Sequence, residues 1–246
     1  MGPVEVYRTS RKKHDQLWNV FFARPLAAPF VTLLLPTRVT PNQVTFWNLF
    51  LFAAAAVVLG AYPGHRGAIW GVVLLEASYV FDCVDGMLAR TKKLASPVGH
   101  LLDFMTDELK AFLLVGAVSI HLWRTVGDVR FLLAGVVGLV VVASGLALTT
   151  FVRRPEYSGK ATTTEAHYET AGEAAAPKSA VRKLAGLVLT FLRFCNHYPS
   201  HIWIFAIFDR LDAFLAMYLM LNFLYLGMTG LGVLVRLGKP LPRSAA

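Results

Sequence analysis

Four aspartates lie at helical spacing within residues 82–107, an arrangement that suits the binding of divalent cations. Asp82 and Asp85 are three residues apart, and Asp103 and Asp107 are four apart, so the members of each pair share one face of a helix. The short polar connection TKKLASP lets the two helices run antiparallel, with all four carboxylates in one pocket. Such a cluster of like charges near lipid is costly unless cations neutralise it.

Carboxylate oxygens as the donors favour Mg²⁺ or Mn²⁺ over Zn²⁺, which prefers nitrogen and sulfur ligands. Two such ions can stabilise both the entering and the leaving oxygen of an in-line displacement at phosphorus. We therefore expect two divalent cations at the four aspartates. The competing interpretation is a salt-bridge network of the aspartates with Arg90, Lys92, Lys93 and Lys110. It is weaker, because Lys92 and Lys93 lie in a polar turn and can face water.

The residues between the aspartates suit a nucleotide diphosphate. Gly86 and Ala89 have minimal side chains, so a ligand can approach the backbone closely, and Gly99 lets the two helices or the nucleotide come near. Arg90 can contact a phosphate bidentately. Close helix packing alone is the alternative explanation for the three small residues.

The full spacing, D-x2-D-G-x2-A-R-x8-G-x3-D-x3-D, resembles the signature of the CDP-alcohol phosphotransferase family, and every signature position is matched. The resemblance extends more loosely to Pro41-Asn42-x-x-Thr45, a sequence that in the family lies close to the active site. It implies transfer of a phosphate-linked group from a CDP-linked donor to an alcohol, with release of CMP. The residues that it assigns to CDP are Asp82, Asp85, Gly86, Ala89, Arg90, Gly99 and Asn42. It also implies that Asp107 is the general base, a role with which metal ligation would compete.

The resemblance leaves the substrates open. Family members use either a CDP-linked lipid with a soluble alcohol or alcohol phosphate, or CDP-choline or CDP-ethanolamine with diacylglycerol. CDP-diacylglycerol is the favoured donor, because the choline and ethanolamine enzymes that resemble this family usually have more helices. Candidate contacts for the acceptor are Lys110, Arg153 and Arg193, since cationic side chains bind phosphorylated alcohols. Arg153 can equally be a positively charged anchor at the membrane surface.

Two other classes of protein compete with a transferase. A carrier would use the acidic cluster as a cation pathway, but it would leave Gly86, Ala89 and Arg90 unexplained, and the sequence shows no inverted repeat. An inactive scaffold would be expected to lose signature residues, and none is lost.

The composition predicts an all-α integral membrane protein that forms one domain over residues 1–246. The chain is 56% hydrophobic and 16% charged, with a mean hydropathy of +0.54, which is too apolar for an ordinary soluble domain. Six stretches approach the roughly 20 apolar residues that a span requires. They are residues 43–62, 67–89, 97–123, 129–152, 184–208 and 212–235. The fifth is interrupted by Arg193, Asn196, His197 and Pro199, which favour a kink or a break.

The N-terminal arm, residues 1–42, carries aromatic and leucine residues at helical spacing between positions 18 and 35. This pattern predicts an interfacial amphipathic helix, although a helix packed on the domain fits as well. Residues 154–183 mix glycine, threonine, alanine and charge without amphipathic period, and predict a cytoplasmic loop.

Lysine and arginine gather in the arm, after the second span, in the loop 154–183 and in the tail. The opposite side carries only Arg66, Arg124, Arg130 and Arg210. This asymmetry predicts that both termini and the active site face the cytoplasm. The net charge of +9 is divided among these membrane-flanking segments, which favours anionic lipid headgroups over nucleic acid as its partner. The family resemblance also implies a homodimer.

Overall fold

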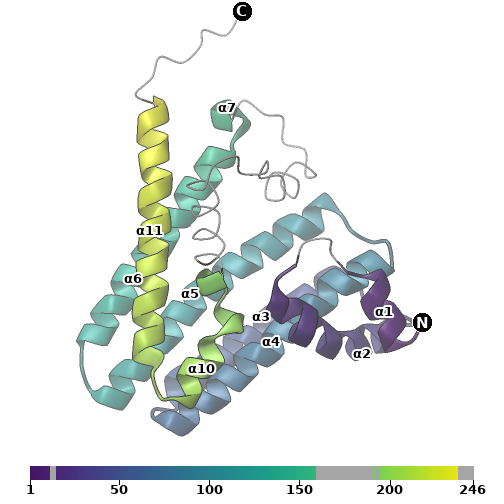
Figure 1. Ribbon diagram of the computed structural model, residues 1–246, viewed down its shortest axis with the longest axis horizontal. Helices are drawn as coiled ribbons and strands as arrows, with labels where there is room; N and C mark the ends of the chain where they lie inside the picture. The colour runs from purple at the N-terminus through teal and green to yellow at the C-terminus, as the bar shows by residue number, and fades with distance from the viewer. Residues whose placement is uncertain (12–14, 159–190, 192–193, 238–246) are drawn as a thin grey trace, which may run out of the picture.

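The computed structural model describes residues 1–11, 15–158, 191 and 194–237, and its regular elements in these ranges are all helical (Figure 1). The N-terminal elements are α1 (Pro3–Thr9), the π-helical turn η1 (Asn19–Ala23) and α2 (Arg24–Leu34). The long helices are α3 (Pro41–Ala61), α4 (His65–Thr91), α5 (Pro97–Val126), α6 (Arg130–Arg153) and α11 (Leu211–Leu237). The short ones are α7 (Pro155–Ser158), the 3₁₀ turn η2 (Tyr198–Ser200) and α10 (Ile202–Ile207).

Five of the described helices are long and apolar enough to cross a membrane, namely α3, α4, α5, α6 and α11. The prediction of six spans is therefore not confirmed. Residues 184–190 and 192–193 of the predicted fifth span lie outside the described residues, as does most of the predicted loop 154–183. The described remainder, from residue 194, breaks into η2, which contains Pro199, and the six-residue α10. A break at this proline agrees with the interruption that the sequence predicts.

The N-terminal arm packs against the helix that carries Asp82 and Asp85. Ala23, Ala27, Ala28 and Val31 of η1 and α2 are buried. They share a core cluster with residues Cys83, Val84, Met87 and Leu88 of α4. Figure 1 shows α1 and α2 on the side of the bundle away from α6 and α11. The predicted interfacial position of this segment is not confirmed, and packing is what the structure shows.

The starts of α3 and α5 are fixed by side-chain caps. Thr40 and Gln43 form a reciprocal capping box before α3, and the Ser96 hydroxyl accepts from the Gly99 N–H at the start of α5. Proline occupies the first position of each helix, where no intrahelical N–H is needed. These caps bring Asn42 next to Gly99, so that a Cβ built on Gly99 would lie 3.2 Å from the Asn42 Oδ1 atom.

A larger core cluster joins α3, α4, α5, α10 and α11, with Phe52, Leu59, Leu75 and Phe214 among its fully buried members. Glycines in the first half of α4 allow α3 to approach closely. A Cβ on Gly71 would lie 2.7 Å from the Leu59 Cβ atom, and one on Gly67 would lie 1.8 Å from the Tyr62 carbonyl oxygen. The antiparallel pair α3 and α4 therefore forms a rigid support for the second half of α4.

Candidate active site

A cavity of about 690 Å³ opens among α4, α5, α6, α11, the N-terminal arm and residues 196–199. Its wall includes Asp82, Asp85, Asp103 and Asp107, so the four aspartates of the signature share one cavity, as the sequence predicts. Gly86 and Arg90 also contribute to the wall. A cavity of this size can hold a nucleotide or a drug-sized ligand.

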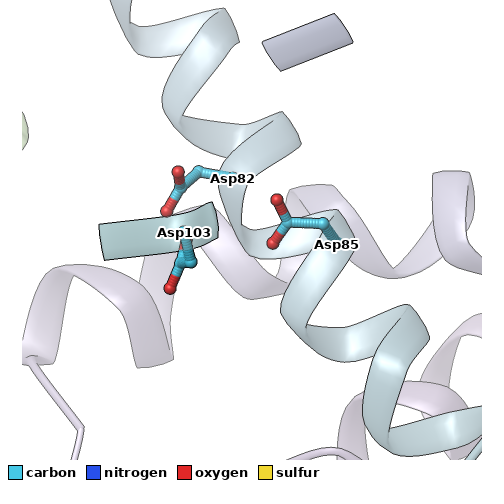
Figure 2. A group of neighbouring side chains, drawn as sticks. All are labelled: Asp82, Asp85 and Asp103. Atoms are coloured by element: carbon cyan, nitrogen blue, oxygen red, sulfur yellow. The ribbon is translucent and has the colours of Figure 1, made fainter. Parts of the chain in front are cut away.

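Three of the four carboxylates form a tight group. One oxygen from each of Asp82, Asp85 and Asp103 lies within 4.8 Å of the others, and Figure 2 shows the two α4 carboxylates beside that of Asp103 on α5. Asp85 is buried, while Asp82 and Asp103 are half-buried. Three carboxylates so close repel one another, and the all-oxygen donor set fits a hard divalent cation such as Mg²⁺ or Mn²⁺. Asp82, Asp85 and Asp103 are therefore the residues that can hold a metal.

Helix α3 orients the two aspartates of α4. Thr45 Oγ1 donates to Asp85 Oδ2 at 2.7 Å, and Asn48 Nδ2 donates to Asp82 Oδ1 at 2.8 Å. The Asn48 amide is itself fixed, because its Oδ1 accepts from Ser78 Oγ at 2.5 Å. Hydrogen bonds of this kind hold metal ligands in place and tune their basicity. Asn48 is fully buried, and its only sequence signal is an amide inside an otherwise apolar stretch.

Asp107 lies apart from the group of three and pairs with Lys110. The Lys110 ammonium contacts Asp107 Oδ1 at 3.1 Å and also forms an ion pair with Asp82. Lys110 is buried, whereas the Asp107 side chain is 56% exposed at the cavity wall. The sequence groups all four aspartates as metal ligands and Lys110 with the acceptor. In the structure, Lys110 lies between Asp82 and Asp107 and forms an ion pair with each.

The small signature residues differ in their surroundings. A Cβ on Gly86 would meet the Arg90 guanidinium, with the nearest atom at 3.4 Å. The three nearest atoms all belong to this side chain, out to 3.9 Å, so close contact with a neighbouring helix does not explain this glycine. Gly99 is crowded by Asn42 and Ser96 instead. Ala89 is half-buried and does not line the cavity.

Of the two arginines predicted to contact the acceptor, only Arg153 falls within the described residues. Its guanidinium lies 4.8 Å from the centre of the Phe104 ring, a cation–π contact. Phe104 belongs to the cavity wall, whereas Arg153, at the end of α6, is exposed and does not line the cavity itself. Arg193 lies outside the described residues.

The N-terminal arm contributes three cavity residues that the sequence does not single out, Gln16, Asn19 and Arg24. They come to the site because η1 and α2 pack on α4, a contact between segments far apart in sequence. Arg24 is 4% exposed and forms an ion pair with Asp15. A buried arginine paired with aspartate has no local sequence pattern that would reveal it.

A chain of hydrogen bonds joins this arm to residues 197–200. Tyr79 OH donates to Asn19 Oδ1 at 2.5 Å, and the Tyr79 hydroxyl oxygen lies 2.7 Å from His197 Nε2. Since a hydroxyl has one proton, Nε2 donates to Tyr79, and the opposite ring nitrogen accepts from Ser200 Oγ at 2.6 Å. Burial, with a smaller contribution from His201, lowers the pKa of His197 to about 4, which keeps its ring neutral at physiological pH.

Comparisons with known proteins point to one family. A model of the CDP-alcohol phosphatidyltransferase family matches residues 38–176. The phosphatidylinositol phosphate synthase of Corynebacterium glutamicum is 29% identical over 137 residues, which are 56% of this chain and 60% of that protein. The bifunctional IPC transferase and DIPP synthase of Aquifex aeolicus is 28% identical over 126 residues, 50% of this chain and 28% of that protein. The chain thus spans less than two thirds of the length of these relatives.

Proposed function

The chain belongs to the CDP-alcohol phosphatidyltransferase family, and from this premise we propose that it transfers a phosphatidyl group from CDP-diacylglycerol to the hydroxyl of an alcohol or alcohol phosphate, releasing CMP. The observation that carries the proposal is the group of Asp82, Asp85 and Asp103 on the wall of a nucleotide-sized cavity, with Asp107 beside it. The Corynebacterium relative is named for making phosphatidylinositol phosphate. A phosphorylated inositol is accordingly the first acceptor to test.

The donor would bind with its diphosphate at the three grouped carboxylates. A divalent cation held by Asp82, Asp85 and Asp103 would neutralise charge on the phosphate oxygens and stabilise the leaving group. Gly86 leaves room for the donor beside α4, and the Arg90 guanidinium next to it can contact a phosphate. Asn42 and Gly99, which adjoin each other at the starts of α3 and α5, do not line the cavity, and their proposed contact with the nucleotide rests on the family signature.

Asp107 is proposed as the general base. The acceptor oxygen attacks the phosphorus nearest the diacylglycerol, a new P–O bond forms, and the bond from that phosphorus to the CMP oxygen breaks. CMP leaves with the electron pair, and the proton of the hydroxyl moves to an Asp107 oxygen. Asp107 lies outside the group of three, which supports the division between Asp107 as base and the other three as metal ligands, since a carboxylate that ligates a metal is a poorer base. The contact of 3.1 Å between Lys110 Nζ and Asp107 Oδ1 fixes the orientation of Asp107.

The acceptor would enter from the part of the cavity between α5, α6 and α11. Arg153, held on Phe104 near this part, is proposed to attract the phosphate of an alcohol phosphate. Arg193 has the same proposed role on sequence grounds. We further propose that the active site and both termini face the cytoplasm and that the enzyme is a homodimer in the bilayer.

The test is CMP release by the purified protein with Mg²⁺ or Mn²⁺. CDP-diacylglycerol is offered with inositol, inositol phosphate, glycerol phosphate or serine, and CDP-choline or CDP-ethanolamine is offered with diacylglycerol. We expect release with CDP-diacylglycerol and one acceptor, loss of release on chelation of the metal, and its loss in Asp107→Asn. Release only with a CDP-linked headgroup would replace the proposed donor, and no release with any pair would overturn the proposed transfer.

A further inference from the structure

We infer that Arg24, on the N-terminal arm outside the signature, is a second guanidinium for the diphosphate of the CDP-linked donor. The inference rests on the proposed function and deepens it by naming a further donor contact. Arg24 begins α2, lines the cavity together with Asp82 and Asp85, and is 4% exposed. The ion pair with Asp15 offsets part of the cost of burying this charge, and an anionic ligand on the cavity wall would offset more of it.

Arg24 and the signature residue Arg90 converge on one atom. Arg24 Nη1 donates to the Ser10 carbonyl oxygen at 3.2 Å, and Arg90 Nε donates to the same oxygen at 2.9 Å. The two guanidiniums therefore lie side by side, at the edge of the cavity where Gly86 leaves space. Two adjacent cations repel each other in a partly buried site. A diphosphate carries two negative charges and presents oxygens to both guanidiniums.

The arginine is held in place without using up its donors. Within the part of the chain that the structure describes, the Arg24 guanidinium forms an ion pair with Asp15 and donates one hydrogen bond to the Ser10 carbonyl oxygen, which leaves most of its five N–H groups available. Asp15 is itself oriented by Asn19 Nδ2, which donates to Asp15 Oδ1 at 3.0 Å. Asn19 is fixed in turn by Tyr79. Asp15 and Asn19 are thus positioning residues, and Arg24 is the group that meets the ligand.

The alternative is that the ion pair of Arg24 with Asp15 only anchors the arm. A charge-swapped variant separates the two roles, because Asp15→Arg with Arg24→Asp restores an ion pair but puts a carboxylate on the cavity wall. The series is completed by Arg24→Gln, by Arg24→Lys, which keeps the charge but loses the planar fork, and by Arg8→Gln as a matched control. Arg8 is exposed on the same arm.

The measurements are made on the purified full chain with Mg²⁺: the Kd of CDP, the KM of CDP-diacylglycerol, the KM of the acceptor, and the thermal unfolding midpoint. Loss of a hydrogen-bonded charge contact weakens binding on the order of 10- to 100-fold. We expect that weakening of CDP binding in Arg24→Gln, a smaller one in Arg24→Lys, and none in Arg8→Gln. The swapped variant should regain thermal stability but not CDP affinity, and the KM should rise for the donor alone.

Several results would overturn the inference: wild-type CDP affinity in Arg24→Gln, recovery of that affinity in the swapped variant, or a KM increase confined to the acceptor. If Arg24→Gln does not fold, Arg24→Lys decides, and unchanged CDP affinity there counts against the role. A wild-type protein that binds CDP but releases no CMP refutes the proposed transfer while the Kd series still judges Arg24. A wild-type protein that does not bind CDP refutes both.

Discussion

The two halves of α4 contain glycines with different surroundings. In the first half, Gly71 lies where an added Cβ would be 2.7 Å from Leu59 Cβ and 2.9 Å from Leu59 Cα. In the second half, the same atom added at Gly86 would meet only the end of the Arg90 side chain, at 3.4 Å. The first glycine is therefore required by the packing of α3, and the second is proposed to leave space on the cavity wall beside Arg90. One helix thus combines a packed support with a face that lines the cavity.

The largest expected loss of activity follows a substitution in the second half of α4. Asp85→Asn should reduce CMP release on the order of 10³-fold, because the group of three loses one of its proposed anionic metal ligands. The fold should persist, since an amide oxygen can still accept from Thr45 Oγ1 as Asp85 Oδ2 does at 2.7 Å. Asp128→Asn, between α5 and α6, is the matched control and should keep full activity. Asp85→Asn activity above about a tenth of wild type would contradict the assigned role.

The two glycines can be compared directly by the same substitution. Gly71→Ala should destabilise the protein by about 1–3 kcal/mol, because the methyl group overlaps the α3 backbone. Gly86→Ala should leave the unfolding midpoint unchanged or raise it, since alanine favours a helix by up to about 1 kcal/mol over glycine. It should nevertheless weaken CDP binding by about tenfold or more.

Thermal unfolding and CDP titration of both variants check this comparison of Gly71 with Gly86. Equal stability losses at the two positions would mean that Gly86 also serves packing. Unaltered CDP binding in a stable Gly86→Ala protein would remove the proposed role of this space.

A smaller effect on the Mg²⁺ requirement is expected when α3 loses a side chain that orients the aspartates. Asn48→Ala removes the 2.8 Å hydrogen bond to Asp82 and leaves Asp82 to its ion pair with Lys110. Such supporting contacts typically change metal affinity or activity by about 10- to 100-fold. The measurement is the Mg²⁺ concentration for half-maximal CMP release. Thr125→Ala, at the far ends of α4 and α5, should not move it, and the idea fails if the two variants behave alike.

The last expected effect is on the stability of the fold and not on activity, and it concerns His197, which is bonded to Tyr79 at the boundary between the two halves of α4. Its pKa is lowered from 6.5 to about 4 in the folded protein, so the folded state is favoured above pH 6.5 and loses this advantage as the pH falls towards 4. The full difference is on the order of 3 kcal/mol. His197→Gln should show a flatter fall in unfolding midpoint between pH 7 and pH 4 than wild type. Parallel curves would refute the contribution.

The sequence predicted the grouping of Asp82, Asp85 and Asp103, because helical period and a short connection leave few other arrangements. The same period predicts Asp107 in the group as well, whereas in the structure Asp107 lies outside the group of three and is joined to Asp82 through Lys110. Asn48, Asn19 and Arg24 reach the site through contacts between distant segments, which no local pattern encodes. The fifth predicted span is not confirmed, because residues 184–190 and 192–193 lie outside the described residues; its described end is broken at Pro199, where the sequence predicts an interruption.

The division of the site among distant segments has a consequence for biosynthesis. A nascent chain that has reached only the end of α4 holds Asp82 and Asp85 but lacks Asp103, and it also lacks His197, the partner of Tyr79. The complete carboxylate group can form only after α5 has paired with α4 in the bilayer. The hydrogen-bond chain from Ser200 to Asp15 closes later still, when residues 197–200 have been synthesised. A chain released from the ribosome before residues 197–200 are synthesised is therefore unable to assemble the whole site.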